Sequence, residues 1–93
     1  VHLGLGDDGH TASLVPSDAG LLVDDRAVTV TGYYRGHRRM TLTRPAIDRA
    51  GLIVWIVRGA DKAAMVDRLI AGDATIPAGL ISQERAVLVT DAI

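Results

Sequence analysis

An aspartate and a histidine stand on either side of a glycine near the start of the chain, in the order Asp8-Gly9-His10. Glycine lets the backbone turn sharply, so both side chains can be presented together at the end of a strand. A carboxylate beside an imidazole orients the ring and stabilises its charged form, which suits general-base chemistry near neutral pH. Asp8 and His10 are therefore candidate catalytic residues, although a single histidine in such a turn is more often a surface or capping residue.

The same segment matches the pattern G-x-G-x-x-G through Gly4, Gly6 and Gly9. This pattern is typical of dinucleotide-binding turns, and Asp24 lies at the distance of their ribose-binding carboxylate. Two features oppose that interpretation. Asp7 and Asp8 place negative charge where a pyrophosphate would bind, and Pro16 ends any following helix too early. We therefore expect no organic cofactor in this turn.

Composition excludes several classes of function. The 93 residues carry a net charge of -1, so the chain as a whole does not attract nucleic acid or an anionic membrane. The stretch 33–39 combines aromatic and basic residues, which single-strand-binding proteins use, but we expect a solvated turn between two strands. The apolar run 52–57 is too short to span a bilayer. We therefore expect neither a nucleic-acid nor a membrane partner.

Cysteine is absent, so disulfides and thiolate metal sites are excluded and a reducing cytoplasm suits the chain. A metal site built from His2, His10 and Asp8 lacks the usual ligand spacing. We expect no metal and a cytoplasmic location.

The elements that must position these residues alternate between strands and helices. We expect strands over residues 1–5, 27–33, 39–43, 52–57 and 86–90. We expect helices over 10–15, after the capping residue Thr43, and over 62–71, with a turn at 35–37 and a loop at 76–79. This order predicts an α/β, Rossmann-like layered fold with a mostly parallel sheet. His10 would begin a helix, whose partial positive charge keeps the ring neutral.

The number of helices indicates an incomplete layer. The run 52–57 has the continuous apolar character of a strand covered on both faces. Only the 62–71 helix has a good apolar stripe, and the other helices are short. Because the chain also begins with Val1 rather than Met, we expect residues 1–93 to form part of a larger domain.

The stretch 3–16, Leu-Gly-Leu-Gly-Asp-Asp-Gly-His-Thr-Ala-Ser-Leu-Val-Pro, resembles the signature of the 6-phosphogluconolactonases, which are grouped with the glucosamine-6-phosphate isomerases/deaminases. The resemblance continues through Arg39-Met-Thr-Leu-Thr43 with Pro45, Gly59-Ala-Asp-Lys-Ala63 and Ile76-Pro-Ala78. It covers the whole chain in the expected order. Val15 stands where the family often has Phe, which is a conservative departure.

The resemblance implies a hydrolase that opens 6-phospho-D-glucono-1,5-lactone to 6-phosphogluconate in the pentose phosphate pathway, without a metal or organic cofactor. It assigns catalysis to His10 with Asp8 beside it, and the sugar phosphate to Lys62. Residues implied to bind the substrate also include Gly6, Gly9 and Arg39. We expect backbone N–H groups of the glycine turn and of the missing half of the enzyme to stabilise the tetrahedral oxyanion.

The resemblance also implies a chain more than twice as long, in which residues 1–93 form only the C-terminal part of a larger domain. The expected partners are therefore the sugar-phosphate lactone and the missing N-terminal half, or a second copy of this chain.

Two alternative functions remain open. The isomerase branch reads Asp-Gly-His-Ile-Ala-Phe-Asn-Glu-Pro, with a glutamate after the histidine. The corresponding stretch 11–16 here, Thr-Ala-Ser-Leu-Val-Pro, has no glutamate, which favours the lactonase branch. The second alternative is an inactive half-domain with a binding or structural role.

Overall fold

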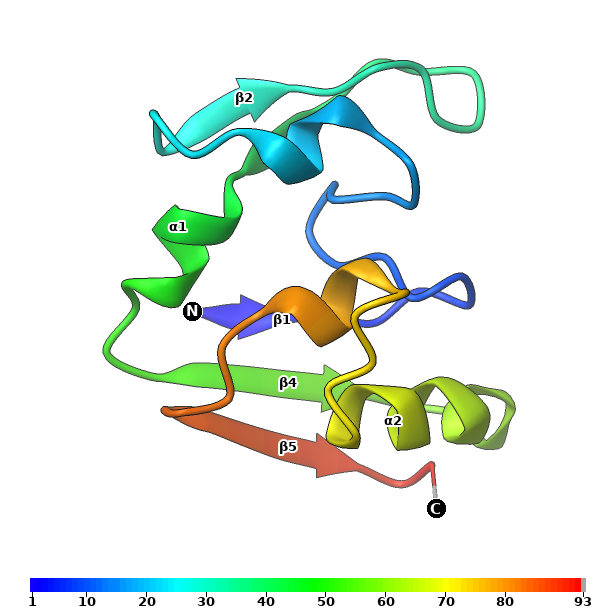
Figure 1. Ribbon diagram of the computed structural model, residues 1–93. Coiled ribbons are helices and arrows are strands. Elements are labelled where there is room, and N and C mark those ends of the chain that lie inside the picture. The colour runs from blue at the N-terminus through cyan, green and yellow to red at the C-terminus, as the bar shows by residue number, and fades with distance from the viewer. Residues whose placement is uncertain (93) are drawn as a thin grey trace.

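The computed structural model describes residues 1–92 and contains two small sheets, which lie at opposite ends of the molecule (Figure 1). The first sheet has three parallel strands in the order β1 (His2–Leu3), β4 (Ile53–Val57) and β5 (Ala86–Thr90). The second pairs β2 (Val28–Val30) with β3 (Met40–Leu42) in antiparallel orientation. The predicted α/β fold with a parallel sheet is confirmed.

Short helices connect the strands. They are α1 (Arg44–Asp48), α2 (Ala63–Ile70) and the 3₁₀ helices η1 (Ala19–Leu22), η2 (Ala60–Lys62) and η3 (Pro77–Leu80). Thr43 caps α1 as predicted, because its hydroxyl accepts a hydrogen bond from the Ala46 N–H (3.4 Å). The predicted 62–71 helix is confirmed, with a 3₁₀ turn before it. The predicted 76–79 loop is wrong, since η3 occupies most of it.

The prediction of a helix over residues 10–15 is also wrong. Thr11 and Leu14 instead pair across a tight turn through two backbone hydrogen bonds of 3.3 and 2.9 Å. The Thr11 hydroxyl donates to the Gly4 carbonyl oxygen (2.8 Å), and the Ser13 N–H donates to the Thr41 hydroxyl (3.1 Å). These side-chain bonds to the backbone compete successfully with a helix of this length, because helix nucleation is costly.

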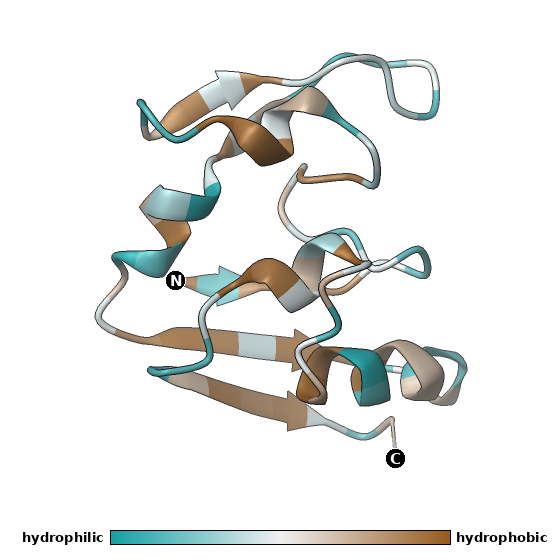
Figure 2. Ribbon diagram, in the orientation of Figure 1, coloured by the Kyte–Doolittle hydropathy of each residue, from teal (hydrophilic) through white to brown (hydrophobic). Residues whose placement is uncertain are grey.

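One face of the parallel sheet builds the core. Ile53, Trp55 and Val57 alternate along β4 and are buried. They belong to the same apolar cluster as Val66 and Leu69 of α2. Figure 2 shows the apolar character of β4 and β5 next to the mixed surface of α2. The apolar stripe of α2 therefore packs where the sequence pattern predicts.

The opposite face of the sheet is open in this chain. Ile56 is 48% exposed, and Val87 and Val89 of the neighbouring strand are 48% and 56% exposed. The register pairs Ile56 with Val89, so these apolar side chains form one continuous patch. No element of residues 1–92 covers this patch, so only one face of the strand at 52–57 is covered in this chain, as the small number of helices indicates.

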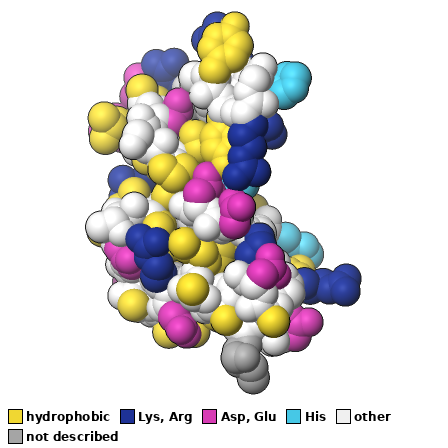
Figure 3. Space-filling view, turned by 90° about the vertical axis from the view of Figure 1, so that its right-hand side faces the viewer, with side chains coloured by type: hydrophobic (Ala, Val, Ile, Leu, Met, Phe, Trp, Pro, Cys, Tyr) yellow, Lys and Arg dark blue, Asp and Glu magenta, His cyan; other side chains and the backbone are white. Residues whose placement is uncertain are grey.

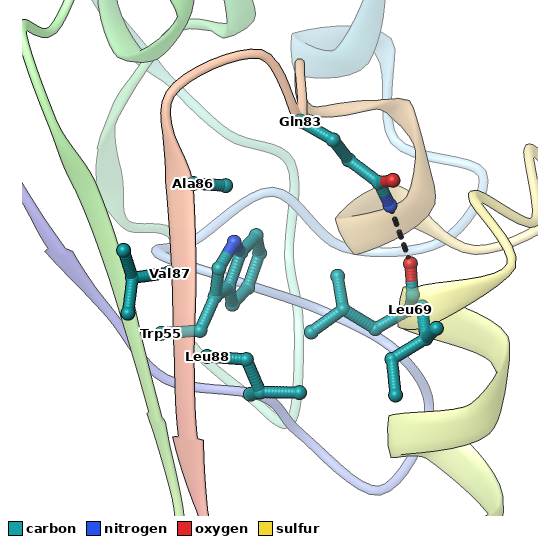
Figure 4. Close-up of a pocket in the computed structure, with 7 residues that line it drawn as sticks. Trp55, Leu69, Gln83, Ala86, Val87 and Leu88 are labelled. Atoms are coloured by element: carbon teal, nitrogen blue, oxygen red, sulfur yellow. Dashed lines mark hydrogen bonds between the residues drawn. The ribbon is translucent and has the colours of Figure 1, made fainter.

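An apolar hollow of about 190 Å³ lies between α2 and β5 (Figure 4). Its lining residues are Trp55, Leu69, Ile70, Gln83, Ala86, Val87 and Leu88. The only hydrogen bond drawn there runs from the Gln83 side-chain amide to the Leu69 carbonyl oxygen (2.7 Å). None of the lining side chains is titratable, so the hollow offers packing surface and no acid–base chemistry. Among residues 1–92, no helix has the length and apolar character needed to cross a membrane.

The 3₁₀ helix η3 supports the glycine turn that carries Asp8 and His10. Gly9 has a φ of +86°, and a Cβ there would lie 2.5 Å from the Ile76 Cβ. The Ala78 N–H donates to the Gly9 carbonyl oxygen (3.0 Å). A glycine at position 9 therefore allows both the positive φ and the close approach of η3. The contact with η3 fixes the position of the turn.

Gly79 offers a test of this support. A Cβ on Gly79 would lie 1.8 Å from the Asp73 carbonyl oxygen, so Gly79→Ala must displace η3. We expect this substitution to lower the free energy of unfolding by about 1–3 kcal/mol. A Cβ on Gly51 would meet no atom within 4 Å, so Gly51→Ala should change that free energy by less than about 0.5 kcal/mol. Urea denaturation measures both, and equal losses would contradict this account of η3.

Candidate active site

The glycine turn brings Asp8 and His10 into direct contact. The turn is closed by a hydrogen bond from the Gly9 N–H to the Gly6 carbonyl oxygen (3.0 Å) and another from the Gly6 N–H to the His10 carbonyl oxygen (2.9 Å). The His10 ring atom Nδ1 lies 2.6 Å from Asp8 Oδ1, and the His10 N–H donates to the same oxygen (3.1 Å). Their side chains are 28% and 31% exposed, so the pair is held firmly and still meets solvent.

The protonation of this pair follows from the carboxylate. Burial raises the pKa of Asp8, but hydrogen bonds from Tyr34 and His10 outweigh burial and lower this pKa to about 2. Asp8 is therefore ionised at neutral pH and only accepts hydrogen bonds. The proton between the two residues then belongs to His10 Nδ1, which leaves Nε2 of the neutral ring free to accept a proton.

The carboxylate takes the place of the expected helix terminus. Because no helix begins at His10, the prediction that a helix dipole keeps the ring neutral is wrong. The ring is oriented by Asp8 through a contact of 2.6 Å, which stabilises the imidazolium when Nε2 is protonated. This arrangement favours proton uptake during a reaction.

Gly6 makes room for the ring. A Cβ on Gly6 would lie 2.1 Å from both Nδ1 and Cε1 of His10. A larger residue would therefore push the ring away from Asp8. In this turn Gly6 makes room for the histidine, and Gly9 allows the close approach of η3. The element that follows Gly9 among residues 1–92 is a turn at 11–14, where the dinucleotide pattern expects a helix.

A hollow of about 380 Å³ adjoins the turn and brings His10 and Lys62 together. Its lining residues are Gly4, Leu5, Gly6, His10, Thr11, Ala12 and Lys62. Lys62 reaches it from η2, and its Nζ donates a hydrogen bond to the Leu5 carbonyl oxygen (2.6 Å). The hollow thus combines an ammonium, which attracts anions, with an imidazole that can accept a proton.

Three predicted site residues lie outside the lining of this hollow, namely Asp8, Gly9 and Arg39. Asp8 is connected to the hollow through its contact with His10. Gly9 packs against Ile76 on the far side of the turn. The Arg39 guanidinium lies 5.7 Å from the centre of the Tyr34 ring. Substrate contacts of Gly9 and Arg39 therefore stay predictions, while Gly6, His10 and Lys62 share one surface.

Three backbone N–H groups of the glycine turn are already hydrogen-bonded within the turn. Those of Gly6, Gly9 and His10 donate to acceptors inside the turn. These hydrogen bonds count against these three groups as oxyanion donors, and the stabilisation of an oxyanion by other N–H groups stays a prediction. The three groups give the turn rigidity instead.

Tyr34 is a contact that sequence reasoning misses. Its hydroxyl donates to Asp8 Oδ2, although the two residues are 26 positions apart. The cluster of aromatic and basic residues at 33–39 is the one available signal, and on its own it favours a solvated turn.

Acidic and basic side chains gather at the narrow middle of the molecule, on the side that faces the viewer in Figure 3.

Within residues 1–92, histidines and carboxylates form no group of three or more that could hold a metal ion. His2 lies in β1 and does not line the hollow that contains His10. The donor set of the candidate site is therefore one imidazole, one carboxylate and one ammonium.

Known proteins resemble this chain in sequence. The chain is 49% identical over 72 residues to a 6-phosphogluconolactonase of Synechocystis, a match that covers 77% of this chain and 30% of that protein. It is 43% identical over 74 residues to a 6-phosphogluconolactonase of Nostoc, covering 80% of this chain and 30% of that protein. The chain thus spans less than half the length of these relatives.

The fold is shared with solved structures. A 6-phosphogluconolactonase from Trypanosoma cruzi superposes with a TM-score of 0.80 at 28% identity, covering 97% of this chain and 37% of that one. The family model for glucosamine-6-phosphate isomerases/6-phosphogluconolactonase matches residues 1–90. Because that match takes in nearly every residue described above, this chain belongs to the glucosamine-6-phosphate isomerase/6-phosphogluconolactonase family.

Proposed function

We propose that this chain is the C-terminal part of a 6-phosphogluconolactonase, which hydrolyses 6-phospho-D-glucono-1,5-lactone to 6-phosphogluconate in the pentose phosphate pathway. The observation that carries the proposal is the oriented Asp8–His10 pair on a hollow that also holds Lys62. Lactone hydrolysis needs a base for water, and a phosphorylated substrate needs a cation; the hollow offers both. The names of the relatives add independent support.

The first step adds water to the lactone. His10 Nε2 takes a proton from the water while the water oxygen forms a bond to the lactone carbonyl carbon, and the carbonyl electron pair moves to its oxygen. Asp8 stabilises the resulting imidazolium through Nδ1, at 2.6 Å in the free protein. General-base assistance of this kind contributes about 10²–10⁴-fold to the rate.

The second step opens the ring. The oxyanion re-forms a carbonyl as the bond from this carbon to the ring oxygen breaks, and the ring oxygen takes the proton from Nε2. The acid formed loses its own proton to solvent, and His10 returns neutral. Donors other than the N–H groups of Gly6, Gly9 and His10 must stabilise the oxyanion, because those groups are already hydrogen-bonded.

Lys62 binds the phosphate of the substrate in this proposal. A carbonyl oxygen anchors its Nζ at the edge of the hollow, which fixes the ammonium without neutralising it. An ammonium contributes a charge-assisted hydrogen bond to a phosphate oxygen. The reaction requires no metal or organic cofactor, since one base and bound water suffice for the chemistry.

The activity belongs to a longer polypeptide. The matched stretches cover 30% of each cyanobacterial relative, and the open sheet face around Ile56, Val87 and Val89 needs a cover. We infer that the N-terminal half of the same enzyme supplies this cover. Association of two copies of this chain is the alternative. The cysteine-free composition suits a cytoplasmic location.

The isomerase/deaminase function is the second candidate, because the family includes it. Its signature has a glutamate after the histidine, and the stretch 11–16 lacks one. We expect the full-length polypeptide to release no ammonia from glucosamine 6-phosphate in a coupled assay. Catalytic release of ammonia would reverse the assignment of branch.

The proposed role of His10 as the general base is tested by His10→Gln in the full-length polypeptide. Without a base at Nε2, kcat/KM for lactone hydrolysis should fall by about 10²–10⁴-fold. A pH-stat assay, corrected for spontaneous hydrolysis, measures it. The control is His37→Gln, because His37 is exposed in a turn away from the hollow. Activity of His10→Gln close to that of the control would refute this role.

The role of Lys62 predicts a change that depends on the phosphate. Lys62→Met should raise KM for the phosphorylated lactone by about 10- to 100-fold, as expected for one charge-assisted hydrogen bond. The slower hydrolysis of glucono-1,5-lactone, which has no phosphate, should not change. Comparing the two substrates in one assay separates phosphate binding from folding. An equal loss on both lactones would show that Lys62 does not recognise the phosphate.

A further inference from the structure

Asp8 has two carboxylate oxygens, and each has its own partner. Oδ1 accepts from Nδ1 and from the backbone N–H of His10. Oδ2 accepts from the hydroxyl of Tyr34, which belongs to the loop between β2 and β3. Apart from His10, Tyr34 is the only residue among 1–92 whose side chain hydrogen-bonds to Asp8, so its hydroxyl helps to fix the plane of the carboxylate in front of the imidazole.

The backbone of the loop directs Tyr34 towards the glycine turn. The Tyr34 N–H donates to the His37 carbonyl oxygen (2.8 Å), and the His37 N–H donates back (3.2 Å). The two residues between them, Arg35 and Gly36, have φ values of +49° and +85°. This geometry is that of a type I′ turn, which gives a tight hairpin end. In Figure 1 this loop lies on the same side of the molecule as the turn at residues 6–10.

The Tyr34 ring is held on several sides. It meets the His10 ring edge-on, with centroids 5.6 Å apart and an interplanar angle of 61°. The guanidinium groups of Arg35 and Arg39 lie 5.0 and 5.7 Å from its centroid, within the range of cation–π attraction. Arg35 is anchored in turn by an ion pair with Asp7 (3.0 Å). These contacts restrict the direction in which the hydroxyl points.

We propose that Tyr34 is a positioning residue for the His10–Asp8 pair: its hydroxyl holds Asp8 Oδ2, so that Oδ1 faces Nδ1 and the imidazole presents Nε2 to the reacting water. The proposal builds on the lactonase function, because it assigns Tyr34 to the same base. Tyr34 acts through Asp8 and does not line the hollow next to His10. Arg39, expected at the substrate, contributes to this arrangement through the Tyr34 ring.

The charges around the pair are consistent with this role. The hydrogen bond to Asp8 raises the pKa of Tyr34, so its phenol stays a donor at neutral pH. The groups facing Asp8 and the phenol are His10, Arg35 and Asp7. Loss of the phenol alone should therefore raise the pKa of Asp8 from about 2 towards its ordinary value of 3.8.

The test is Tyr34→Phe in the full-length polypeptide, which keeps the ring and removes only the hydroxyl. The matched control is Tyr33→Phe, since Tyr33 is the neighbouring tyrosine and is 79% exposed. We expect Tyr34→Phe to lower kcat for lactone hydrolysis about three- to tenfold with KM unchanged, as one lost hydrogen bond predicts. Tyr33→Phe should leave both constants unchanged.

Nuclear magnetic resonance supplies readouts that do not depend on turnover. In Tyr34→Phe, the ¹⁵N shifts of His10 should show fewer neutral rings with the proton on Nδ1, and the ¹³C titration of the Asp8 carboxyl should move to higher pH. A wild-type tautomer population and a wild-type Asp8 titration would overturn the proposal, even if activity fell. If the wild-type polypeptide hydrolysed no lactone, the proposed function would fail, and these two readouts would still decide the role of Tyr34.

Discussion

A single short contact, 2.6 Å between Asp8 Oδ1 and His10 Nδ1, determines what this surface can do chemically. It assigns the ring proton to Nδ1 and leaves Nε2 as the basic atom, because an aspartate with a pKa of about 2 only accepts hydrogen bonds at neutral pH. Burial opposes ionisation of Asp8, and hydrogen bonds overcome it. The contact therefore depends on the groups that donate hydrogen bonds to the Asp8 carboxylate.

Much of the tertiary structure serves that turn. The 3₁₀ helix η3 holds Gly9 from one side, and Thr41 of β3 binds the segment that follows His10. The loop between β2 and β3 brings Tyr34 to Asp8, and η2 delivers Lys62 to the adjoining hollow. The turn follows the carboxyl end of β1, which is the edge at which open parallel sheets bind their ligands. Segments remote in sequence thus converge on one edge.

Patterns with a local cause predicted the structure well. The apolar run at 52–57 forms the central parallel strand, Thr43 caps its helix, and the glycine in Asp8-Gly9-His10 brings the two side chains together. Each of these depends on residues within a few positions of one another. A short-range pattern contains enough information in such cases.

Features that depend on distant partners escaped prediction. The 10–15 segment looks helical on its own, but hydrogen bonds to Gly4 and Thr41 fold it into a turn. The contact between Tyr34 and Asp8 leaves no periodicity in the sequence, because it depends on where a hairpin 26 residues away is directed. The element that covers the open face of β4 also escaped prediction, because apolar character shows that a strand can be covered and does not identify what covers it.

A crystal structure of the full-length polypeptide with 6-phosphogluconate tests the central claim most directly. The account predicts that the product carboxylate lies within hydrogen-bond distance of His10 Nε2, while Nδ1 keeps its contact with Asp8 and the phosphate contacts Lys62 Nζ. Product bound away from this hollow would contradict the account. A His10 ring turned so that Nδ1, and not Nε2, faces the carboxylate of the product would also contradict it.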